Sequence, residues 1–289
     1  MTGLVAIVDI GKTHLKLHVL SESGELLKAF ELANQVVTGD PYPHFDTDSH
    51  WQWLMDALAG FDDVGKISKV VPVTHGAAAA LVDETGLVLP ILDYEYEGVA
   101  DTNTDYDLLR DPFVGSLSPN LPMGLNLGHQ LHWQQKHFPE AFSRATALLL
   151  YPQFWAWRLS GVLASEVTSL GAHSDLWRPE KKEFSTLVSR MGWSQLMPPI
   201  QHAWEALGTI RQDVAARTGL PADCEIFCGI HDSNASYLRY IKDQTESISV
   251  VSTGTWVICM GGSVSTDQLV EQRDMLANVD ARGRPVPTA

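Results

Sequence analysis

Cysteine is scarce in this sequence, which has only three among its 289 residues. Cys224, Cys228 and Cys259 form an odd and sparse set, which argues against a disulfide framework and favours a reducing compartment. The N-terminus has no basic leader before its apolar run, so no secretory signal is predicted. These absences together predict a cytoplasmic protein.

Long apolar runs and positive charge are also in short supply. The nearest candidate for a membrane helix, ATALLLYPQFWAW, falls short of the ~18 residues required and is interrupted by Pro152 and Gln153. Only 20 Lys and Arg face 35 Asp and Glu, which gives a formal charge of -15. This balance argues against nucleic acid or an anionic membrane as the main partner. It permits a phosphorylated ligand, because backbone N–H groups and a bound metal hold phosphate without a basic surface.

The residues that are present suit an ordinary globular protein, with 45% hydrophobic and 19% charged residues and hence a sizeable core. At about 150 residues per domain, the length predicts one large domain or two ordinary ones. Residues 93–126 are rich in Asp, Asn, Pro and Gly and are predicted to form a long functional loop or insertion. Apolar spacing predicts strands over 5–8, 15–20, 26–32 and 67–75 and helices over 128–138, 152–159 and 211–218.

The opening stretch, VAIVDIGKTHLKLHVL, places polar residues at the tip of a hairpin whose strands look built for a core. A tight turn directs several N–H groups at one point, and Gly11 lets a phosphate approach the backbone. The carboxylate of Asp9 is suited to holding Mg²⁺ through water, because magnesium keeps most of its hydration shell. Lys12 and Thr13 add a charge and a hydroxyl. Taken alone, this stretch is equally an ordinary hairpin with a polar tip.

A second stretch, GIHDSNAS at residues 229–236, places Asp232 between an apolar strand and the start of a predicted helix. A carboxylate at a helix N-terminus is stabilised in its charged form. Held near a sugar hydroxyl, it can accept the proton as that hydroxyl attacks a γ-phosphoryl group. The alternative for this stretch alone is that Asp232 serves only as a helix N-cap.

A third stretch, STGTW at residues 252–256, repeats the arrangement of the first hairpin: an apolar strand, a polar tip with a glycine, and an outgoing strand. Such a repeat predicts two related lobes. We expect a first lobe over residues 1–246 and the opening of a second, incomplete lobe over 247–289, ending in a loop-like tail, ANVDARGRPVPTA. A single domain with a ragged tail is the alternative.

As an ordered set, the three stretches resemble the FGGY family of carbohydrate kinases, within the sugar kinase, Hsp70 and actin superfamily. DIGKT resembles the family's Asp-x-Gly-x-Thr phosphate hairpin, and GIHDSNAS resembles its Gly-x-x-Asp-x-x-Ala/Ser block. STGTW resembles the Ser-x-Gly-Thr hairpin that opens the second domain. The motifs are closest to those of rhamnulokinase-, fuculokinase- and xylulokinase-like ketose kinases. The likeness covers the whole chain, but only the first half or so of a typical family member.

The resemblance implies an α/β fold, namely an RNase H-like (actin-like ATPase) domain with a central mixed five-stranded sheet flanked by helices. The opening strands of a second similar domain would follow, with residues 1–246 as the sugar-binding and catalytic domain and 247–289 as the start of the ATP-binding domain. The activity implied is ATP-dependent phosphorylation of a small sugar, a ketose such as a pentulose or deoxy-hexulose. ATP and Mg²⁺ are the implied cofactors, and a homodimer is a candidate assembly.

The resemblance also assigns roles to individual residues. Asp232 would be the general base and Asp9 the Mg²⁺-associated carboxylate. On the sugar side, THGAAAALVDETG resembles the block in which pentulose kinases read MHG, and LDYEYEG takes the place of their Trp-Asn/Gln-Asp-x-Arg stretch without its arginine. The nucleotide phosphates would lie at Gly11, Lys12, Thr13, Ser252, Gly254 and Thr255, and the sugar at Thr74, His75, Gly76, Asp93, Tyr94, Glu95 and Asp232.

Two other functions fit the same scaffold. One is a non-catalytic sugar- or nucleotide-binding protein, which gains weight from the expected incomplete second lobe. The other is an Hsp70- or actin-like ATPase, which the aspartate of GIHDSNAS disfavours because its place after a strand suits a sugar acceptor.

Overall fold

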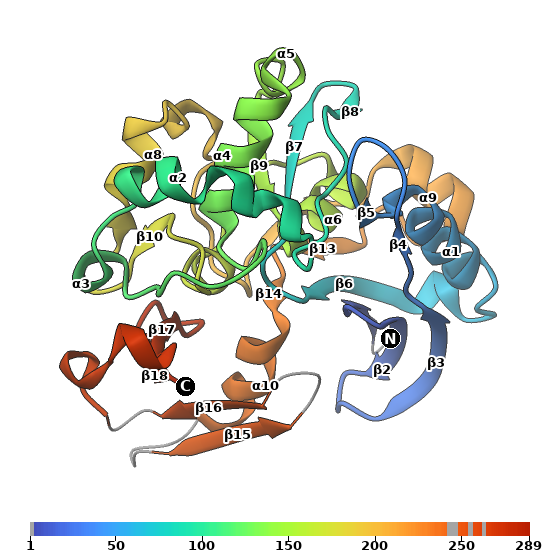
Figure 1. The fold of residues 1–289 in the computed structure, drawn as a ribbon. Coiled ribbons are helices and arrows are strands. Elements are labelled where there is room, and N and C mark those ends of the chain that lie inside the picture. The colour runs from blue at the N-terminus through green and yellow to red at the C-terminus, as the bar shows by residue number, and fades with distance from the viewer. Residues whose placement is uncertain (1–2, 242–247, 254–256, 262–263) are drawn as a thin grey trace.

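The central sheet of this computed structural model, which describes residues 3–241, 248–253, 257–261 and 264–289, mixes parallel and antiparallel pairings (Figure 1). The strand order is β12-β13-β6-β1-β2-β3, and β14 also pairs with β6. The predicted α/β fold with a mixed sheet flanked by helices is confirmed. The bounds are β1 Leu4–Ile10, β2 His14–Ser21, β3 Leu26–Ala33, β6 Ile67–Thr74, β12 Ala206–Thr209, β13 Glu225–Phe227 and β14 Ile230–His231.

Among the described residues, the sheet has seven strands instead of the predicted five. Part of the difference is a broken strand, because β13 and β14 both run parallel to β6 and are separated only by Cys228 and Gly229. Gly229 has a φ of +85°, and a Cβ there would lie 2.5 Å from the carbonyl oxygen of Pro72, so only glycine fits. The buried amide of Gln153 donates to the carbonyls of Cys228 and Gly229 at 3.0 and 3.3 Å, which ties this break to helix α6 (Tyr151–Ser160).

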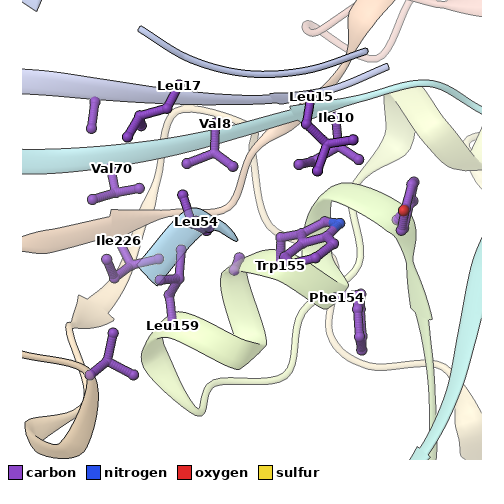
Figure 2. Packing of buried hydrophobic residues seen from close by; sticks show 14 of the residues in the cluster. Val8, Ile10, Leu15, Leu17, Leu54, Val70, Phe154, Trp155, Leu159 and Ile226 are labelled. Carbon is purple, nitrogen blue, oxygen red and sulfur yellow. The ribbon is translucent and has the colours of Figure 1, made fainter. Parts of the chain in front are cut away.

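The main hydrophobic core lies against one face of the sheet. Alternate residues of β1 and β2 are fully buried on that face, as the period of two in a strand requires. Figure 2 shows Val8, Ile10, Leu15 and Leu17 packed over Leu54, Trp155 and Leu159. These last side chains come from α1 (Thr47–Ala59) and α6, and α9 (Gln212–Thr218) adds Val214 to the same core. Asp9 lies on β1 between buried residues and is itself half-buried.

A second apolar cluster covers the sheet formed by β7 (Ala79–Asp83), β8 (Gly86–Leu87) and β9 (Ala147–Leu150). Residues 93–126, predicted as a loop or insertion, contain η2 (Glu97–Thr102), α2 (Asn103–Leu109) and α3 (Phe113–Ser116), so the loop alternative was wrong in part. The reason is long-range: Tyr106 is fully buried and donates to Asp175 at 2.7 Å, and Arg110 forms an ion pair with Asp175 at 3.1 Å.

The C-terminal residues form a four-stranded sheet in the order β15-β16-β18-β17. The tail predicted as loop-like contains the β17–β18 hairpin, so that prediction was wrong. Its turn is held by Asp280, whose Oδ1 accepts from the backbone N–H of Arg282 and Arg284 at 2.9 Å each. The predicted domain boundary at Glu246 falls outside the described residues and stays a prediction. The bounds are α10 Asp232–Ile241, β15 Ser249–Thr253, β16 Val257–Gly261, β17 Leu276–Val279 and β18 Pro285–Thr288.

The remaining elements are short, apart from α4, and connect these units. Within the described ranges, no helix combines the length and apolar character needed to cross a membrane. The bounds are β4 Val36–Val37, β5 His44–Phe45, η1 Val64–Lys66, α4 Leu127–His137, α5 Pro139–Phe142, α7 Val167–Leu170, β10 Trp177–Arg178, β11 Glu183–Phe184, α8 Thr186–Arg190, η3 Ser194–Leu196, η4 Thr266–Gln268 and η5 Glu271–Arg273.

Candidate active site

Three neighbouring parallel strands end at the same edge of the central sheet and bring Asp9 and Asp232 together. β1 and β14 pair with opposite sides of β6, and Asp9 and Ile230 are both in register with Val73. Asp232 follows β14 directly and is the first residue of α10. The pKa of Asp9 is raised, first by burial and then by the negative charge of Asp232. The two carboxylates singled out from the sequence are therefore electrostatic neighbours.

Hydrogen bonds from Ser233 hold one oxygen of the Asp232 carboxylate in place. Its Oδ1 accepts from the backbone N–H of Ser233 at 2.6 Å and from the Ser233 hydroxyl at 3.3 Å. Burial raises the pKa of Asp232 even though 41% of the side chain is exposed, and nearby His75 opposes this rise. A carboxylate with a raised pKa, an anchored Oδ1 and solvent access is suited to accepting a proton.

His231, the residue before this aspartate, was not singled out from the sequence. Its Nε2 lies 3.2 Å from Oδ1 of Asp232, and its Nδ1 lies 3.1 Å from the side-chain nitrogen of Asn234. Burial lowers the pKa of His231 to about 4, so the ring is neutral at pH 7. With the Asn234 amide donating to Nδ1, the ring proton sits on Nε2 and faces Asp232. The sequence places His231 next to Asp232, but only the folded structure shows that the His231 ring is directed at the Asp232 carboxylate.

Gly76 leaves the room that the His231 ring occupies. A Cβ at position 76 would lie 2.9 Å from Nε2 and 3.3 Å from Cδ2 of His231. The His231 ring has little freedom to retreat, because it is buried and bonded to Asn234. The close approach gives a physical reason for glycine at this predicted sugar-side position.

We expect Gly76→Ala to lower the free energy of unfolding by about 1–3 kcal/mol, the usual cost of overpacking a tight site. Urea denaturation of the purified variant measures this loss. Gly65→Ala is the matched control, because a Cβ at position 65 meets nothing within 4 Å. Equal stability of the two variants would mean that the His231 ring moves away freely.

His75 is the predicted sugar-side residue whose geometry best suits a ligand. Its ring packs against Phe45 and Tyr151, with centroids 5.0 Å away in each case. Its Nδ1 lies 2.7 Å from the carbonyl oxygen of Gly76, whereas the buried Nε2 has no partner among the described residues. Burial lowers the pKa of His75 to about 4, so this nitrogen belongs to a neutral ring. A buried polar atom without a partner is suited to a ligand hydroxyl.

Thr74, which neighbours His75, faces inward instead. It is fully buried, and its hydroxyl donates to the carbonyl of His75 at 2.9 Å. That hydrogen bond satisfies the hydroxyl within the protein. The structure therefore places Thr74 beside the site, with its hydroxyl directed at the backbone.

The hairpin tip predicted to cradle phosphate is a tight turn with rigid supports. The N–H of Gly11 donates to the carbonyl of His14 at 2.9 Å, which closes the turn. Asn34 at the end of β3 braces it, donating from its side chain to the carbonyl of Gly11 at 2.7 Å and from its backbone to that of Thr13 at 2.8 Å. The Thr13 side chain is exposed at the tip, where a ligand can reach it.

The side chain of Lys12 reaches away from this tip toward the second predicted sugar stretch. Its ammonium forms ion pairs with Asp93 and with Glu95, the latter at 3.1 Å. It also lies over the rings of Tyr94 and Phe45, 4.6 and 5.2 Å from their centroids. Lys12 thus connects the predicted phosphate hairpin to the acidic stretch LDYEYEG. This is the stretch compared above with the Trp-Asn/Gln-Asp-x-Arg motif of pentulose kinases.

An open pocket of about 640 Å³ lies beside these ion pairs. It is lined by Lys12, Thr13, Asn34, Val36, Thr38, Pro43, Asp93, Glu95, Tyr96, Glu97 and Gly98. The pocket therefore touches both the predicted phosphate hairpin and the predicted sugar stretch.

The second predicted cradle is described only in part. Ser252 is exposed on β15. Gly254 and Thr255 lie outside the described residues. Phosphate binding by these three residues stays a prediction.

A buried glutamate lies behind the site. Oε2 of Glu166 accepts from the backbone N–H of Thr168 at 2.9 Å and from its hydroxyl, and that hydroxyl accepts from the N–H of His231 at 3.1 Å. Oε1 of Glu166 has no partner among the described residues. Burial raises the pKa of Glu166 to about 8, so the side chain is mostly protonated at neutral pH. Glu166 thus supports the strand end that carries His231 and Asp232.

We expect Glu166 to make the folded state lose stability as the pH rises. Its pKa is about 8 in the fold, against 4.5 as the ordinary value, so between these values the folded chain binds an extra proton. The free energy of unfolding then falls by up to about 1.4 kcal/mol per pH unit across this window, and Glu166→Gln removes that contribution. Urea denaturation of both proteins at about pH 6 and about pH 7 compares the slopes. Identical slopes would show that Glu166 does not retain its proton.

Comparison with known proteins brings these observations together. The sequence profile of the FGGY family of carbohydrate kinases, N-terminal domain, matches residues 112–238, and that of the carbohydrate kinase FGGY C-terminal domain matches residues 245–289. L-fuculokinase from Escherichia coli (strain K12) is 24% identical over 279 residues, which cover 91% of this chain and 57% of the relative.

Solved structures agree with these matches. A carbohydrate kinase from Novosphingobium aromaticivorans superposes with a TM-score of 0.92 at 39% identity, covering 100% of this chain and 62% of that one. Gluconate kinase from Lactobacillus acidophilus shares the fold, with a TM-score of 0.77 at 15% identity, 99% of this chain and 59% of that one. The chain thus spans less than two thirds of the relatives it matches. On the ordered motifs, the fold and both profiles, the chain belongs to the FGGY family of carbohydrate kinases.

Proposed function

We propose that this protein is an ATP-dependent carbohydrate kinase that transfers the γ-phosphoryl group to a hydroxyl of a small sugar. The observation that carries the proposal is the convergence of Asp9 and Asp232 at one sheet edge, with Asp232 at the start of α10. We further propose a ketose as acceptor, either a deoxy-hexulose, as the name of the L-fuculokinase relative suggests, or a pentulose.

In this mechanism Asp232 is the general base. Its anchored Oδ1 keeps the carboxylate in place, and its second oxygen takes the proton from the acceptor hydroxyl during attack on phosphorus. His231 contributes a neutral ring next to Oδ1, which orients the carboxylate without adding a charge. His75 offers its unpartnered Nε2 to a hydroxyl of the sugar, which fixes the acceptor close to the base.

The residues present fit ATP and Mg²⁺. ATP supplies the phosphoryl group, and Mg²⁺ neutralises charge on the phosphate oxygens. The half-buried carboxylate of Asp9 would hold Mg²⁺, because magnesium prefers oxygen ligands. The braced turn at Gly11 and the exposed Thr13 hydroxyl are suited to phosphate, and Ser252, Gly254 and Thr255 are proposed to join them. The ammonium of Lys12, predicted from the sequence to lie at the phosphates, instead pairs with Asp93 and Glu95.

A screen of ketoses and polyols with coupled detection of ADP tests the proposal. The longest natural chain that contains this sequence should be used, because the relatives are longer. We expect sugar-dependent ADP release with one or a few ketoses. Binding of a sugar in calorimetric titration without turnover would instead support a non-catalytic binding protein. ATP hydrolysis that no sugar changes would support an ATPase.

A further inference from the structure

We propose that the open pocket beside Lys12 binds the acceptor, and that Lys12, Asp93 and Glu95 make it selective for uncharged sugars over sugar acids. The inference rests on the proposed function and names the charge class of its acceptor. Family membership leaves this class open, since the matched relatives include both an L-fuculokinase and a gluconate kinase.

The first argument is the charge of the pocket lining. Among the described lining residues, three carboxylates, those of Asp93, Glu95 and Glu97, face a single ammonium, that of Lys12. Two of the three already contact this ammonium. A sugar carboxylate would therefore meet an excess of negative charge and a lysine whose charge is already matched. Unfavourable charge in a pocket is a common means of excluding a competing ligand.

The second argument is that Lys12 has little freedom to turn to a new anion. Its side chain is only 13% exposed, and its ammonium lies over the rings of Tyr94 and Phe45. Asp93 is also buried, and its Oδ1 accepts from the N–H of Glu95 at 3.3 Å. Leaving Asp93 unpaired in this setting would be unfavourable. Lys12 is thus a positioning residue for Asp93.

The third argument links this pocket to the reaction centre. The rings of Phe45 and Tyr94, which lie under the Lys12 ammonium, also pack against His75, with centroids 5.0 and 5.6 Å from its ring. His75 lies within electrostatic range of both Lys12 and Asp232, since the charge of Asp232 raises its pKa and the charge of Lys12 lowers it. Lys12, which lines the pocket, is therefore connected to the neighbourhood of Asp232 through these two rings and His75. The hydroxyls of a sugar in the pocket can donate to the carboxylates, which an uncharged polyol does at no cost in charge repulsion.

The experiment compares uncharged and acidic acceptors in the wild type. D-xylulose, L-xylulose and L-fuculose represent the uncharged class, and D-gluconate and L-gulonate the acids. We expect the best uncharged sugar to exceed the best acid in kcat/KM by about 100-fold or more, the scale of discrimination that unfavourable polar contacts achieve. An acid that matches or exceeds every uncharged sugar would overturn the inference.

Two substitutions test the charge argument through the ratio of kcat/KM values. Glu95→Gln frees part of the Lys12 charge and should move the ratio toward the acids by about tenfold, whereas Lys12→Met removes the ammonium and should move it further against them. Glu140→Gln, at an exposed site outside the pocket, is the control. If Lys12 instead serves only the nucleotide phosphates, Lys12→Met raises the KM for ATP and leaves the ratio unchanged, which refutes the inference.

Calorimetric titration of the same variants with the same sugars separates this inference from the proposed function. Preferential binding of uncharged sugars without turnover supports the selectivity while refuting the kinase. Turnover with a preference for acids supports the kinase function and refutes the selectivity. Failure of both sugar classes to bind refutes the selectivity.

Discussion

Replacing Asp232 by asparagine is expected to lower kcat by about 10²- to 10⁴-fold, the usual contribution of a positioned general base. Asparagine has the same shape, and its side-chain oxygen can still accept from the N–H of Ser233, but the amide cannot take up the acceptor's proton. Steady-state kinetics with the best sugar from the screen measures the effect. The KM values should change less than kcat, because the substitution leaves the pocket lining intact.

The matched control for this substitution is Asp223→Asn, which changes an exposed aspartate just before β13. It should leave kcat within about twofold, since surface changes away from the site have little effect. Thermal unfolding of Asp232→Asn guards against a trivial loss of fold. We expect no loss of stability, because the substitution removes a charge that burial disfavours. Full turnover by a folded Asp232→Asn protein would refute the mechanism.

Truncating Trp155 to alanine is expected to lower the free energy of unfolding by about 3–5 kcal/mol. The side chain is fully buried in the core beneath the central sheet, where Figure 2 shows it close to Ile10 and Leu15. Its ring also stacks on that of Trp51, with centroids 6.5 Å apart. Alanine would remove this packing and leave a cavity that helix and sheet cannot close fully. Urea denaturation followed by circular dichroism measures the loss.

Trp204→Ala is the control for the Trp155 prediction. Trp204 is 51% exposed and stacks on His202 at the surface, so its truncation should cost less than about 1 kcal/mol. Similar losses for both substitutions would show that the core packs loosely around Trp155.

The strands of the central sheet and the ends of several helices could be predicted because their signals are local. Alternating apolar residues define β2, and its alternate side chains are buried as expected. The continuous apolar run of β1 predicts burial on both faces, which is wrong because only alternate side chains of β1 are fully buried. Gly219 ends α9 in the left-handed conformation that favours glycine, with a φ of +82°. In contrast, the helices within residues 93–126 depend on Asp175, which lies far along the chain and pairs with Tyr106 and Arg110.

The C-terminal hairpin escaped prediction for a different reason. Pro285 and Pro287 indicate a loop in a local reading, because proline cannot donate to a sheet. β18 nevertheless pairs with β17 along its whole length, with Pro287 opposite Ala277. Val286, between the two prolines, is buried and anchors the strand. Tertiary packing thus overrides the local signal.

In the candidate site, too, features with a local sequence signal could be predicted, and features that depend on distant residues could not. Asp9 and Asp232 follow from motifs, because each lies at the end of a strand where a functional side chain is expected. The ion pair between Lys12 and Asp93 joins residues 81 positions apart, and no local pattern encodes it. The orientation of the His231 ring likewise depends on Gly76, which contributes only the absence of a side chain.

The break between β13 and β14 at Gly229 makes the position of Asp232 depend on the protein interior. Gln153 holds the two carbonyls at this break from the same helix that carries Trp155. The aspartate three positions beyond Gly229 is thus aligned by the interior of the protein and not by a surface loop. Remote changes in that interior should misalign the base by fractions of an ångström, so that catalytic efficiency declines while the chain still appears intact.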